Sequence, residues 1–442
     1  MRDPSGSIEF KGDWVYRYLK TPLDKDHFLR SELASKLVNE GTLIGYEFVD
    51  ELTLKSPKID IITFPTEWTA EQFHKAAALT LKLHEDAIKI GWGLKDASAW
   101  NVVFLGLTPV FVDLLSFEPL RHKFWHAAGQ YSRHFLLPLY LNKLHILRPN
   151  QAMQLWRDGV PPQEAKHLAG TRRFLSRYWP LMSEHKDKNN QGHAESHSYQ
   201  DILGFQSKLC QGFKWMLDGV LPRKVSDRET VWGTYEDSRD HYTDTELQFK
   251  RKTLGLWLKE LKPNLIIDIG CNAGEFSEIA VSYGARAICW DADSEALGLL
   301  ARRYDKSNSF FPILSAIDDL SGGRGWVGEE FPGLMSRIEN RADIVLFLAI
   351  THHLAIAGSI PLKEIAKLLS RLCKRGVIYE LISESDPKLL GLCQKYDRNP
   401  LDFSADKQLE ALQFSGFSIV DRVAHEPSST RELFWLERTK AE

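Results

Sequence analysis

Cysteine is scarce in this chain, with five residues (Cys210, Cys271, Cys289, Cys373 and Cys393) among 442. The number is odd, the spacing is wide, and no C-x-x-C pair or nearby histidine stands at the spacing of zinc ligands. This scarcity excludes a small disulfide-stapled fold and a zinc ribbon. We therefore expect reduced thiols in a cytoplasmic protein, and no metal site.

Long apolar runs and an excess of one charge are also missing. The longest apolar stretches, 135–141 and 344–350, are much shorter than the roughly 20 residues that cross a bilayer, and the polar N-terminus lacks the apolar core of a secretory signal. Because 56 Lys+Arg face 59 Asp+Glu, no global charge draws the chain to nucleic acid or to a membrane. A local excess of +8 between Arg121 and Lys188 comes from twelve basic and four acidic residues. Solvated helix faces explain it most simply.

A polar segment near the middle, 184–201, divides the chain. We expect an α+β N-terminal domain (1–183), a linker with a connecting helix (184–224), and an α/β domain (225–442). In the first domain, residues 69–90 have helical spacing, and two strands are expected at 102–105 and 110–115. In the last domain, short apolar runs alternate with helical segments, which is typical of a parallel sheet with helices on both faces. These runs are 265–268, 287–290, 311–314, 343–349, 377–381, 417–423 and 432–436.

The first of these runs leads into a glycine-rich turn, D-I-G-C-N-A-G, at Asp268–Gly274. Gly270 and Gly274 allow backbone angles that other residues avoid and let a ligand approach the main chain closely. The next predicted strand ends at Asp291, whose carboxylate can accept hydrogen bonds from ribose hydroxyls. This order of elements predicts a nucleoside site. A dinucleotide is disfavoured, because the turn lacks the G-x-G-x-x-G spacing that seats a pyrophosphate.

The turn, Asp291, the acidic pair after the third strand and the fourth strand together resemble class I S-adenosylmethionine-dependent methyltransferases, over roughly 225–442. The resemblance implies a Rossmann-like sheet of seven strands, with the last strand inserted antiparallel, and S-adenosylmethionine as the cofactor. The turn would frame the methionine end, Asp291 would hold the ribose, and the loop after the third strand would meet the adenine. The cofactor-binding residues that it implies are Asp268, Gly270, Cys271, Asn272, Gly274, Asp291, Ala292, Ile317, Asp318 and Asp319.

The fourth apolar run ends in Thr351-His352-His353, at the carboxyl edge where open parallel sheets bind ligands. A histidine with its usual pKa near 6.5 can take a proton from an acceptor hydroxyl or amine, so His352 or His353 is the candidate base. The alternative is that both pack or hydrogen-bond beside the cofactor. Methyl transfer from a sulfonium needs alignment more than base assistance.

The N-terminal half contains a second chemical pattern, K-D-x-x-x-x-N from Lys95 to Asn101, followed by a hairpin and Asp113. The spacing is similar to the catalytic loop and metal-binding Asp of kinase-like phosphotransferases. Asp96, Asn101 and Asp113 would be the corresponding residues. A glycine-rich loop and a V-A-I-K-like strand are missing upstream, so a degenerate lobe, or plain turn and cap residues, is favoured over an active kinase.

Both halves together resemble bacterial two-part methyltransferases of the NoeA (nodulation protein) group. We therefore expect a methyltransferase that acts on an O or N atom, with an N-terminal domain that selects or encloses the acceptor. A small molecule or a sugar is favoured over a macromolecule as the acceptor, and nucleic acid and membrane are not favoured. The alternatives are a phosphotransferase that uses magnesium at Asp96, Asn101 and Asp113, and a cofactor-binding module without turnover.

Overall fold

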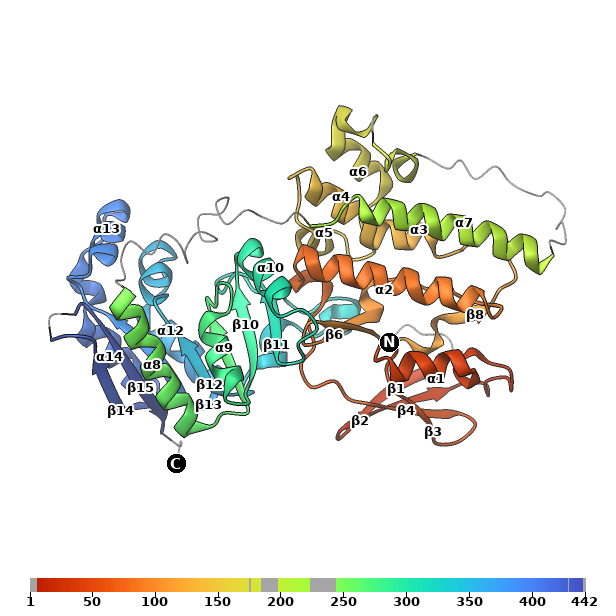
Figure 1. Ribbon diagram of the computed structural model, residues 1–442. Helices are drawn as coiled ribbons and strands as arrows, with labels where there is room; N and C mark the ends of the chain where they lie inside the picture. The colour runs from red at the N-terminus through yellow and green to blue at the C-terminus, as the bar shows by residue number, and fades with distance from the viewer. Residues whose placement is uncertain (1–5, 175, 184–197, 223–243, 428, 440–442) are drawn as a thin grey trace. The chain divides into compact units, whose positions relative to one another are not determined.

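The computed structural model describes residues 6–174, 176–183, 198–222, 244–427 and 429–439 (Figure 1). The chain divides into two compact units. The first comprises Met1–Lys224 together with Gly325–Glu330, and the second comprises Val225–Arg324 and Phe331–Glu442. Within the described residues, no helix is long and apolar enough to cross a membrane.

The first unit begins with a four-stranded antiparallel sheet of order β1-β2-β4-β3. Two short antiparallel pairs, β5 with β8 and β6 with β7, follow it. Most residues of β1 are exposed, and most residues of β2 are partly buried. The strands are β1 (Gly6–Lys11), β2 (Trp14–Leu19), β3 (Glu47–Phe48), β4 (Thr53–Pro57), β5 (Trp92–Leu94), β6 (Val102–Leu105), β7 (Thr108–Phe111) and β8 (Phe117–Pro119).

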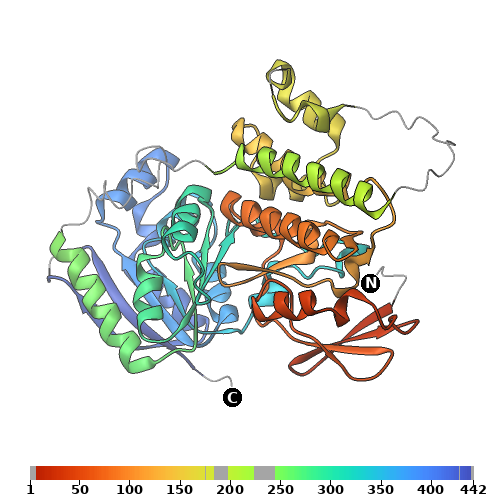
Figure 2. The ribbon, with the colours of Figure 1, turned by 45° about the vertical axis from the view of Figure 1, so that its right-hand side comes forward.

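Helix α2 (Ala70–Ile88) is the central helix of this unit, and it confirms the helical spacing seen in the sequence. It begins with a capping box, in which Thr69 Oγ1 accepts from Gln72 N at 3.3 Å and Gln72 Oε1 accepts from Thr69 N at 3.0 Å. It lies beside α7 (Tyr199–Asp218), as Figure 2 shows. The remaining helices are α1 (Glu32–Asn39), α3 (Ala128–Tyr131), α4 (Leu137–Lys143), α5 (Pro149–Leu155) and α6 (Pro162–Ala169).

One expected strand of the first unit is shifted. The sequence predicted 110–115, but β7 is Thr108–Phe111 and the chain leaves the hairpin after Phe111. The reason is Asp113, whose Oδ1 accepts from Leu115 N at 3.3 Å and caps a 3₁₀ turn at Leu114–Ser116. An apolar run that follows a capping Asp can therefore form a turn rather than a strand.

The second unit is built on a seven-stranded sheet of order β11-β10-β9-β12-β13-β15-β14. All neighbouring pairs from β11 to β13 are parallel, and β15 is antiparallel to both β13 and β14. Each strand matches one of the apolar runs, so the Rossmann-like seven-stranded sheet is confirmed. The strands are β9 (Leu265–Ile269), β10 (Arg286–Asp291), β11 (Phe310–Leu314), β12 (Ala342–Phe347), β13 (Cys373–Ile382), β14 (Phe417–Ala424) and β15 (Arg431–Arg438).

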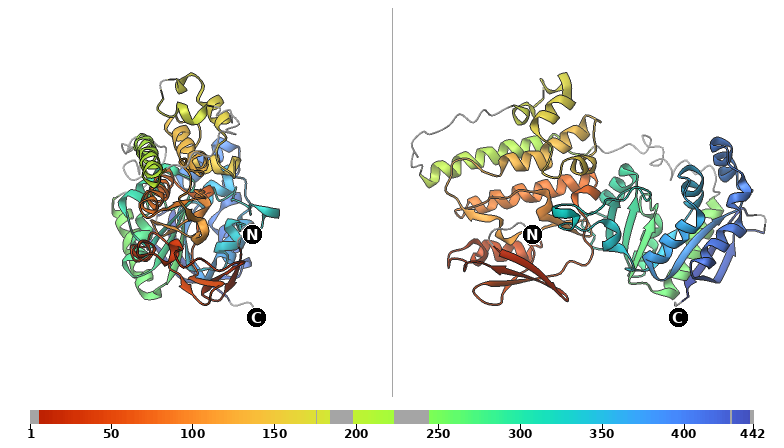
Figure 3. Two further views of the ribbon diagram at one scale, coloured as in Figure 1. Left: turned by 90° about the vertical axis from the view of Figure 1, so that its right-hand side faces the viewer. Right: turned by 180° about the vertical axis from the view of Figure 1, so that it is seen from behind.

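Helices cover both faces of this sheet (Figure 3). Successive residues of a strand point to opposite faces, and on β13 Tyr379 bonds to Gln408 of α14 whereas Glu380 bonds to Lys250 of α8. Helices α8 and α14 therefore lie on opposite faces, with α9 packed against α8 and α12 against α14. The helices are α8 (Asp244–Leu261), α9 (Glu275–Ser282), α10 (Ser294–Arg303), α11 (Leu334–Ile338), α12 (Leu362–Leu372), α13 (Pro387–Tyr396) and α14 (Ala405–Phe414).

Candidate cofactor and active site

The glycine-rich turn joins β9 to α9 at the carboxyl edge of the sheet. Gly270 has a φ of 69° and Gly274 a φ of 86°, angles that residues with a Cβ rarely adopt. A hydrogen bond from Gly270 N to Trp290 O (2.8 Å) holds the turn against β10, and one from Gly274 N to Cys271 O (2.9 Å) closes the turn itself. A Cβ on Gly270 would lie 2.6 Å from Ile350 Cδ1, so the Ile350 side chain packs against this residue and leaves no space for a Cβ. Both the backbone angle and this packing therefore require glycine at position 270.

Asp291 ends β10 directly beside this turn. Its Oδ2 accepts from Asn272 N and its Oδ1 accepts from Asp293 N, both at 2.8 Å. Burial raises the pKa of the Asp291 carboxyl, and the hydrogen bonds from the main chain oppose this shift. Main-chain N–H groups of Asp293, Asn272 and Ala292 bond to this carboxylate. A carboxylate has about four acceptor positions, so the group can still accept a hydrogen bond from a ribose hydroxyl. The neighbouring Ala292 is exposed.

Asp268 occupies a different environment from Asp291. It is 2% exposed and its Oδ2 accepts from Ser277 Oγ at 2.6 Å, while Ser277 Oγ in turn accepts from Cys289 Sγ at 3.3 Å. Burial raises the pKa of the Asp268 carboxyl to about 7. Its described contact therefore fixes α9 to the sheet, and contact with a ligand stays a prediction.

The turn residues Cys271 and Asn272 have structural contacts of their own. Cys271 is 4% exposed, and burial raises the pKa of its thiol well above the usual value. A buried thiol that stays protonated is a poor nucleophile. Asn272 has a φ of 50°, and its Oδ1 accepts from Ala273 N at 2.7 Å. These two residues therefore shape the turn, and their contact with a cofactor stays a prediction.

The loop after β11 lies next to Asp291 in the sheet. Trp290 Nε1 donates to Ser315 O at 2.8 Å, and Ser315 N donates to Asp291 O at 3.0 Å. Beyond this anchor, Ile317 is half-buried while Asp318 and Asp319 are exposed. The loop therefore offers one apolar side chain and two carboxylates on the same side of the sheet edge as Asp291.

The two histidines follow β12 and differ in accessibility. His352 is 3% exposed, whereas His353 is half-buried and begins a short π-helix, His353–Ala357. Their ring centroids are 4.2 Å apart. Burial lowers the pKa of His353, and the positive charges of Arg431 and Lys388 lower it further. His353 is therefore neutral at pH 7, the form that accepts a proton.

A buried hydrogen-bond chain supports Thr351, the residue before the two histidines, from the face of the sheet that α14 covers. Thr351 Oγ1 and Tyr379 Oη are 2.6 Å apart, and Tyr379 Oη donates to Gln408 Oε1 at 2.9 Å. Gln408 Nε2 then donates to Ile382 O and Phe403 O, at 2.7 and 2.8 Å. Because the amide of Gln408 is held at both ends, Thr351 is fixed directly before the histidines.

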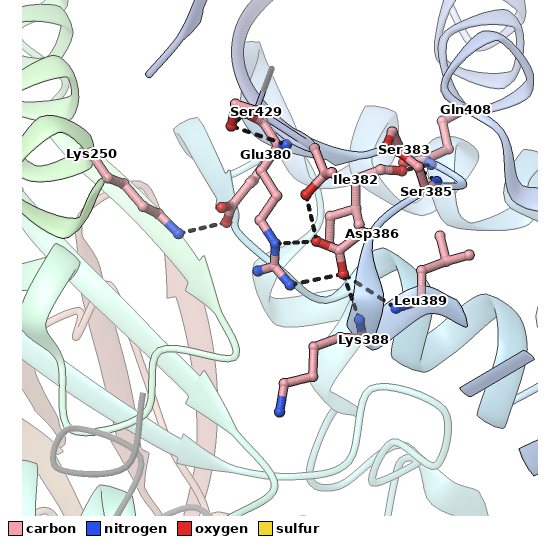
Figure 4. Close-up of polar contacts among 12 residues, drawn as sticks. Lys250, Glu380, Ile382, Ser383, Ser385, Asp386, Lys388, Leu389, Gln408 and Ser429 are labelled. Atoms are coloured by element: carbon pink, nitrogen blue, oxygen red, sulfur yellow. Dashed lines mark hydrogen bonds and ion pairs between the residues drawn. The ribbon is translucent and has the colours of Figure 1, made fainter. Parts of the chain in front are cut away.

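Two ion pairs beside the site were missed by the sequence analysis (Figure 4). Lys250 Nζ of α8 lies 2.5 Å from Glu380 Oε2 of β13, and 4.7 Å from the ring centroid of Phe276. Asp386 accepts from Arg431 Nε at 2.8 Å, and its Oδ1 caps α13. Lys250 and Glu380 are 130 positions apart in the sequence, and Asp386 and Arg431 are 45 positions apart. A lone basic residue in an amphipathic helix carries no local signal of such a pairing.

The kinase-like pattern of the first unit is partly brought together. Asp113 Oδ2 accepts from Ser116 Oγ at 2.5 Å, and Asn101 Nδ2 donates to the same Ser116 Oγ at 3.4 Å. Asp113 Oδ1 also forms an ion pair with Arg17 Nη1 of β2 at 2.9 Å. Asp96 instead caps the next turn through Ser98 N at 2.9 Å. The described residues include no cluster of His, Cys, Asp or Glu side chains that could hold a metal ion.

The strand order of the second unit, its antiparallel last strand, and the glycine turn beside Asp291 define the fold of class I S-adenosylmethionine-dependent methyltransferases. No protein-family model matches the chain. Along nearly its whole length the chain resembles the nodulation protein NoeA of Rhizobium meliloti (strain 1021), with 29% identity over 466 residues that cover 99% of this chain and 95% of NoeA.

Solved methyltransferase structures are also similar to part of the chain. N-methyltransferase NodS from Bradyrhizobium japonicum WM9 is 14% identical, with a TM-score of 0.33, and covers 45% of this chain and 98% of its own. Magnesium protoporphyrin IX methyltransferase from Synechocystis PCC 6803, solved with bound S-adenosylmethionine, is 16% identical, with a TM-score of 0.33. The match covers 49% of this chain and 100% of that methyltransferase.

Proposed function

We propose that this protein is an S-adenosylmethionine-dependent methyltransferase. The observation that carries the proposal is the arrangement of Asp291, whose carboxylate stands at the end of β10 and is bound by Asn272 N and Asp293 N beside the glycine turn. A ribose has the vicinal hydroxyls that such a carboxylate binds. Gly270 and Gly274 support a ligand close to the main chain of the turn, because both have backbone angles that residues with a Cβ rarely adopt.

The residues present fit the cofactor along its length. Gly270 and Gly274 would face its methionine part, Asp291 its ribose, and Ile317 with Asp318 or Asp319 its adenine. When bound, S-adenosylmethionine supplies a methyl group on a sulfonium, which already carries a good leaving group. The chain's own contribution is to hold cofactor and acceptor in line and to exclude water at the carboxyl edge of β12.

We assign the base to His353 rather than to His352, because His353 is the more accessible of the two and is neutral at pH 7. Its imidazole would take the proton from an acceptor O–H or N–H as the methyl group arrives, which leaves a neutral methylated product and a protonated histidine. His352 is buried, and we propose that it packs beside His353 and orients it.

Calorimetry with S-adenosylmethionine and S-adenosylhomocysteine tests the cofactor assignment. We expect Asp291→Ala to weaken binding about tenfold or more, since at least one hydrogen bond to a charged group is lost at about 1.5–3 kcal/mol. Asp406→Ala is the matched control, because it also removes a carboxylate of this unit but from the exposed first turn of α14. Undiminished binding by Asp291→Ala would refute the site. Conversion of bound cofactor to S-adenosylhomocysteine distinguishes an enzyme from a binding module without turnover.

The second candidate is a phosphotransferase in the first unit. The observation in its favour is that Asn101 and Asp113 meet at Ser116 Oγ, as two ligands of one metal ion would have to do. Against it, Arg17 already occupies an oxygen of Asp113. We therefore expect no binding of ATP with magnesium at micromolar concentrations. Binding that disappears in Asp113→Ala would establish this second activity.

A further inference from the structure

A cavity of about 410 Å³ lies in the second unit, beyond the carboxyl ends of β12 and β13. Ala355 and Ser359–Lys363 line one side, and residues between Arg398 and Ala411, from the end of α13 to α14, line the other. This volume falls within the range of sites for small molecules, roughly 300–1,000 Å³. The cofactor contacts proposed above leave the cavity unassigned.

The cavity shares its wall with the proposed catalytic loop. The π-helix His353–Ala357 carries His353 at its first position and Ala355 on the cavity wall. Short π-helices are rare in proteins, and those that occur often lie at functional sites. On the opposite wall Phe403 accepts, through its main-chain oxygen, from Gln408 of the buried chain that reaches Thr351. Both walls are therefore tied to the residues that surround the histidines.

The backbone is strained where the cavity meets its main cation. Ser359 is not a glycine yet has a φ of 54°, and its Oγ accepts from Arg398 Nη2 at 2.9 Å. Helix α13 ends with Asp397 in the left-handed conformation, which turns the chain so that Arg398 lines the cavity. Backbone strain of this kind persists at sites where function requires it.

The charges of the lining favour an anion. Three cations, Lys363, Arg398 and Lys407, face two carboxylates, and one of these, Asp402, is already paired with Lys407 at 2.9 Å. Among the described residues, Arg398 has a hydroxyl as its side-chain partner and no carboxylate. A guanidinium presents a fork of donors that matches a carboxylate or phosphate. The rest of the lining includes apolar side chains, namely Ile360, Leu362, Phe403 and Ala411.

We propose that this cavity is the acceptor site, and that it takes a small molecule with an apolar body and a carboxylate or phosphate group bound by Arg398. The proposal rests on the proposed methyltransferase function. It deepens that function by naming the chemical class of the acceptor. The cofactor site and the cavity are lined by different residues, so the two assignments can be tested apart.

Calorimetry with benzoate, phenyl phosphate and benzyl alcohol tests the site, with and without S-adenosylhomocysteine. We expect at least one of the two anions to bind and benzyl alcohol to bind at least tenfold more weakly. Arg398→Gln should lower the affinity for the anion about tenfold. The preferred anion identifies the group as carboxylate or phosphate. Arg422→Gln on the exposed part of β14 is the matched control and should bind as wild type does. Equal binding of the alcohol, no anion binding, or an equal loss in Arg422→Gln would overturn the proposal.

The acceptor role is tested by incubating the protein with S-adenosylmethionine and a small-molecule extract of the cells that make it. We expect S-adenosylhomocysteine to form, and to fall about tenfold both with Arg398→Gln and after the extract has passed over an anion-exchange resin. Activity that survives both treatments would overturn the assignment. Affinity for S-adenosylmethionine should stay unchanged in Arg398→Gln. If wild type failed to bind S-adenosylmethionine while it still bound the anions, the proposed function would be wrong and the cavity would be an anion site alone.

Discussion

Removing one partner of the Lys250–Glu380 pair should destabilise the second unit strongly. The two side chains are 6% and 3% exposed, and Nζ lies 2.5 Å from Oε2. Breaking a buried pair leaves an uncompensated charge and costs about 3–5 kcal/mol, whereas replacing both partners by apolar residues of similar size is nearly neutral. We therefore expect Lys250→Met and Glu380→Met each to destabilise the unit within this range, and the double variant to recover most of the loss.

The two single variants should not be equal, because Arg431 lies close enough to act on Lys250. The positive charge of Arg431 lowers the pKa of Lys250, after burial, which is the largest cause. In Lys250→Met the remaining Glu380 still has a cation nearby. In Glu380→Met the positive charge of Arg431 acts on the remaining Lys250 more strongly than the opposing carboxylate of Glu275 does. Glu380→Met should therefore be the more destabilised of the two. A buried lysine left alone can also lose its proton, which would limit the cost.

Hydrogen exchange of β12 and β13 followed by mass spectrometry is the suitable assay. A two-unit chain need not unfold in one step, and exchange of central strands reports on the second unit alone. Urea midpoints of the full chain serve as the check. The reasoning would be refuted if either single variant stayed within about 1 kcal/mol of wild type, or if the double variant lost as much as the two single variants together.

Three further predictions concern titrating and catalytic groups. His353→Gln should lower the rate of methyl transfer by about 100-fold or more at unchanged cofactor affinity. The acid limb of the wild-type pH–rate profile should have a midpoint below pH 6.5, because the pKa of His353 is lowered from its usual value. A midpoint above pH 6.5 would exclude His353 as the base. The raised pKa of Asp268, about 7 against 3.8, gives stability that is present below pH 3.8 and is lost as the pH rises towards 7. Asp268→Asn should therefore melt above wild type at pH 8 and lose that advantage towards pH 4, which thermal unfolding at both pH values checks. Gly270→Ala should lower the affinity for S-adenosylmethionine at least tenfold, because the φ of 69° and the contact with Ile350 both disfavour a Cβ at this position. Calorimetry measures this affinity, and a wild-type value would show that the turn does not bind the cofactor.

The seven strands of the second unit could be predicted because their signal is local. Strands buried on both faces form apolar runs, and β9 is buried at every position, Asp268 included. The backbone angles of the glycine turn and the position of Asp291 at the end of β10 were equally predictable, and the binding of a cofactor by these residues stays a prediction. The failure at 110–115 was local too. There the capping side chain of Asp113 prevailed over an apolar run that favoured a strand.

What the sequence could not reveal are the partners of long charged side chains. Lys250 and Glu380 are separated by 130 positions, and Ser359 and Arg398 by 39. Neither distance follows from any periodicity, since the crossover helices that bring these residues together differ in length. Arg398 stands in an exposed segment that the sequence marks only as polar, and its importance arises from the cavity that it lines. The proposed acceptor contacts therefore depend on tertiary structure at the carboxyl edge, whereas the proposed cofactor contacts come from a turn and two strand ends that follow in order within residues 268–319. A single sequence could for this reason predict the reaction class of the protein but not the acceptor.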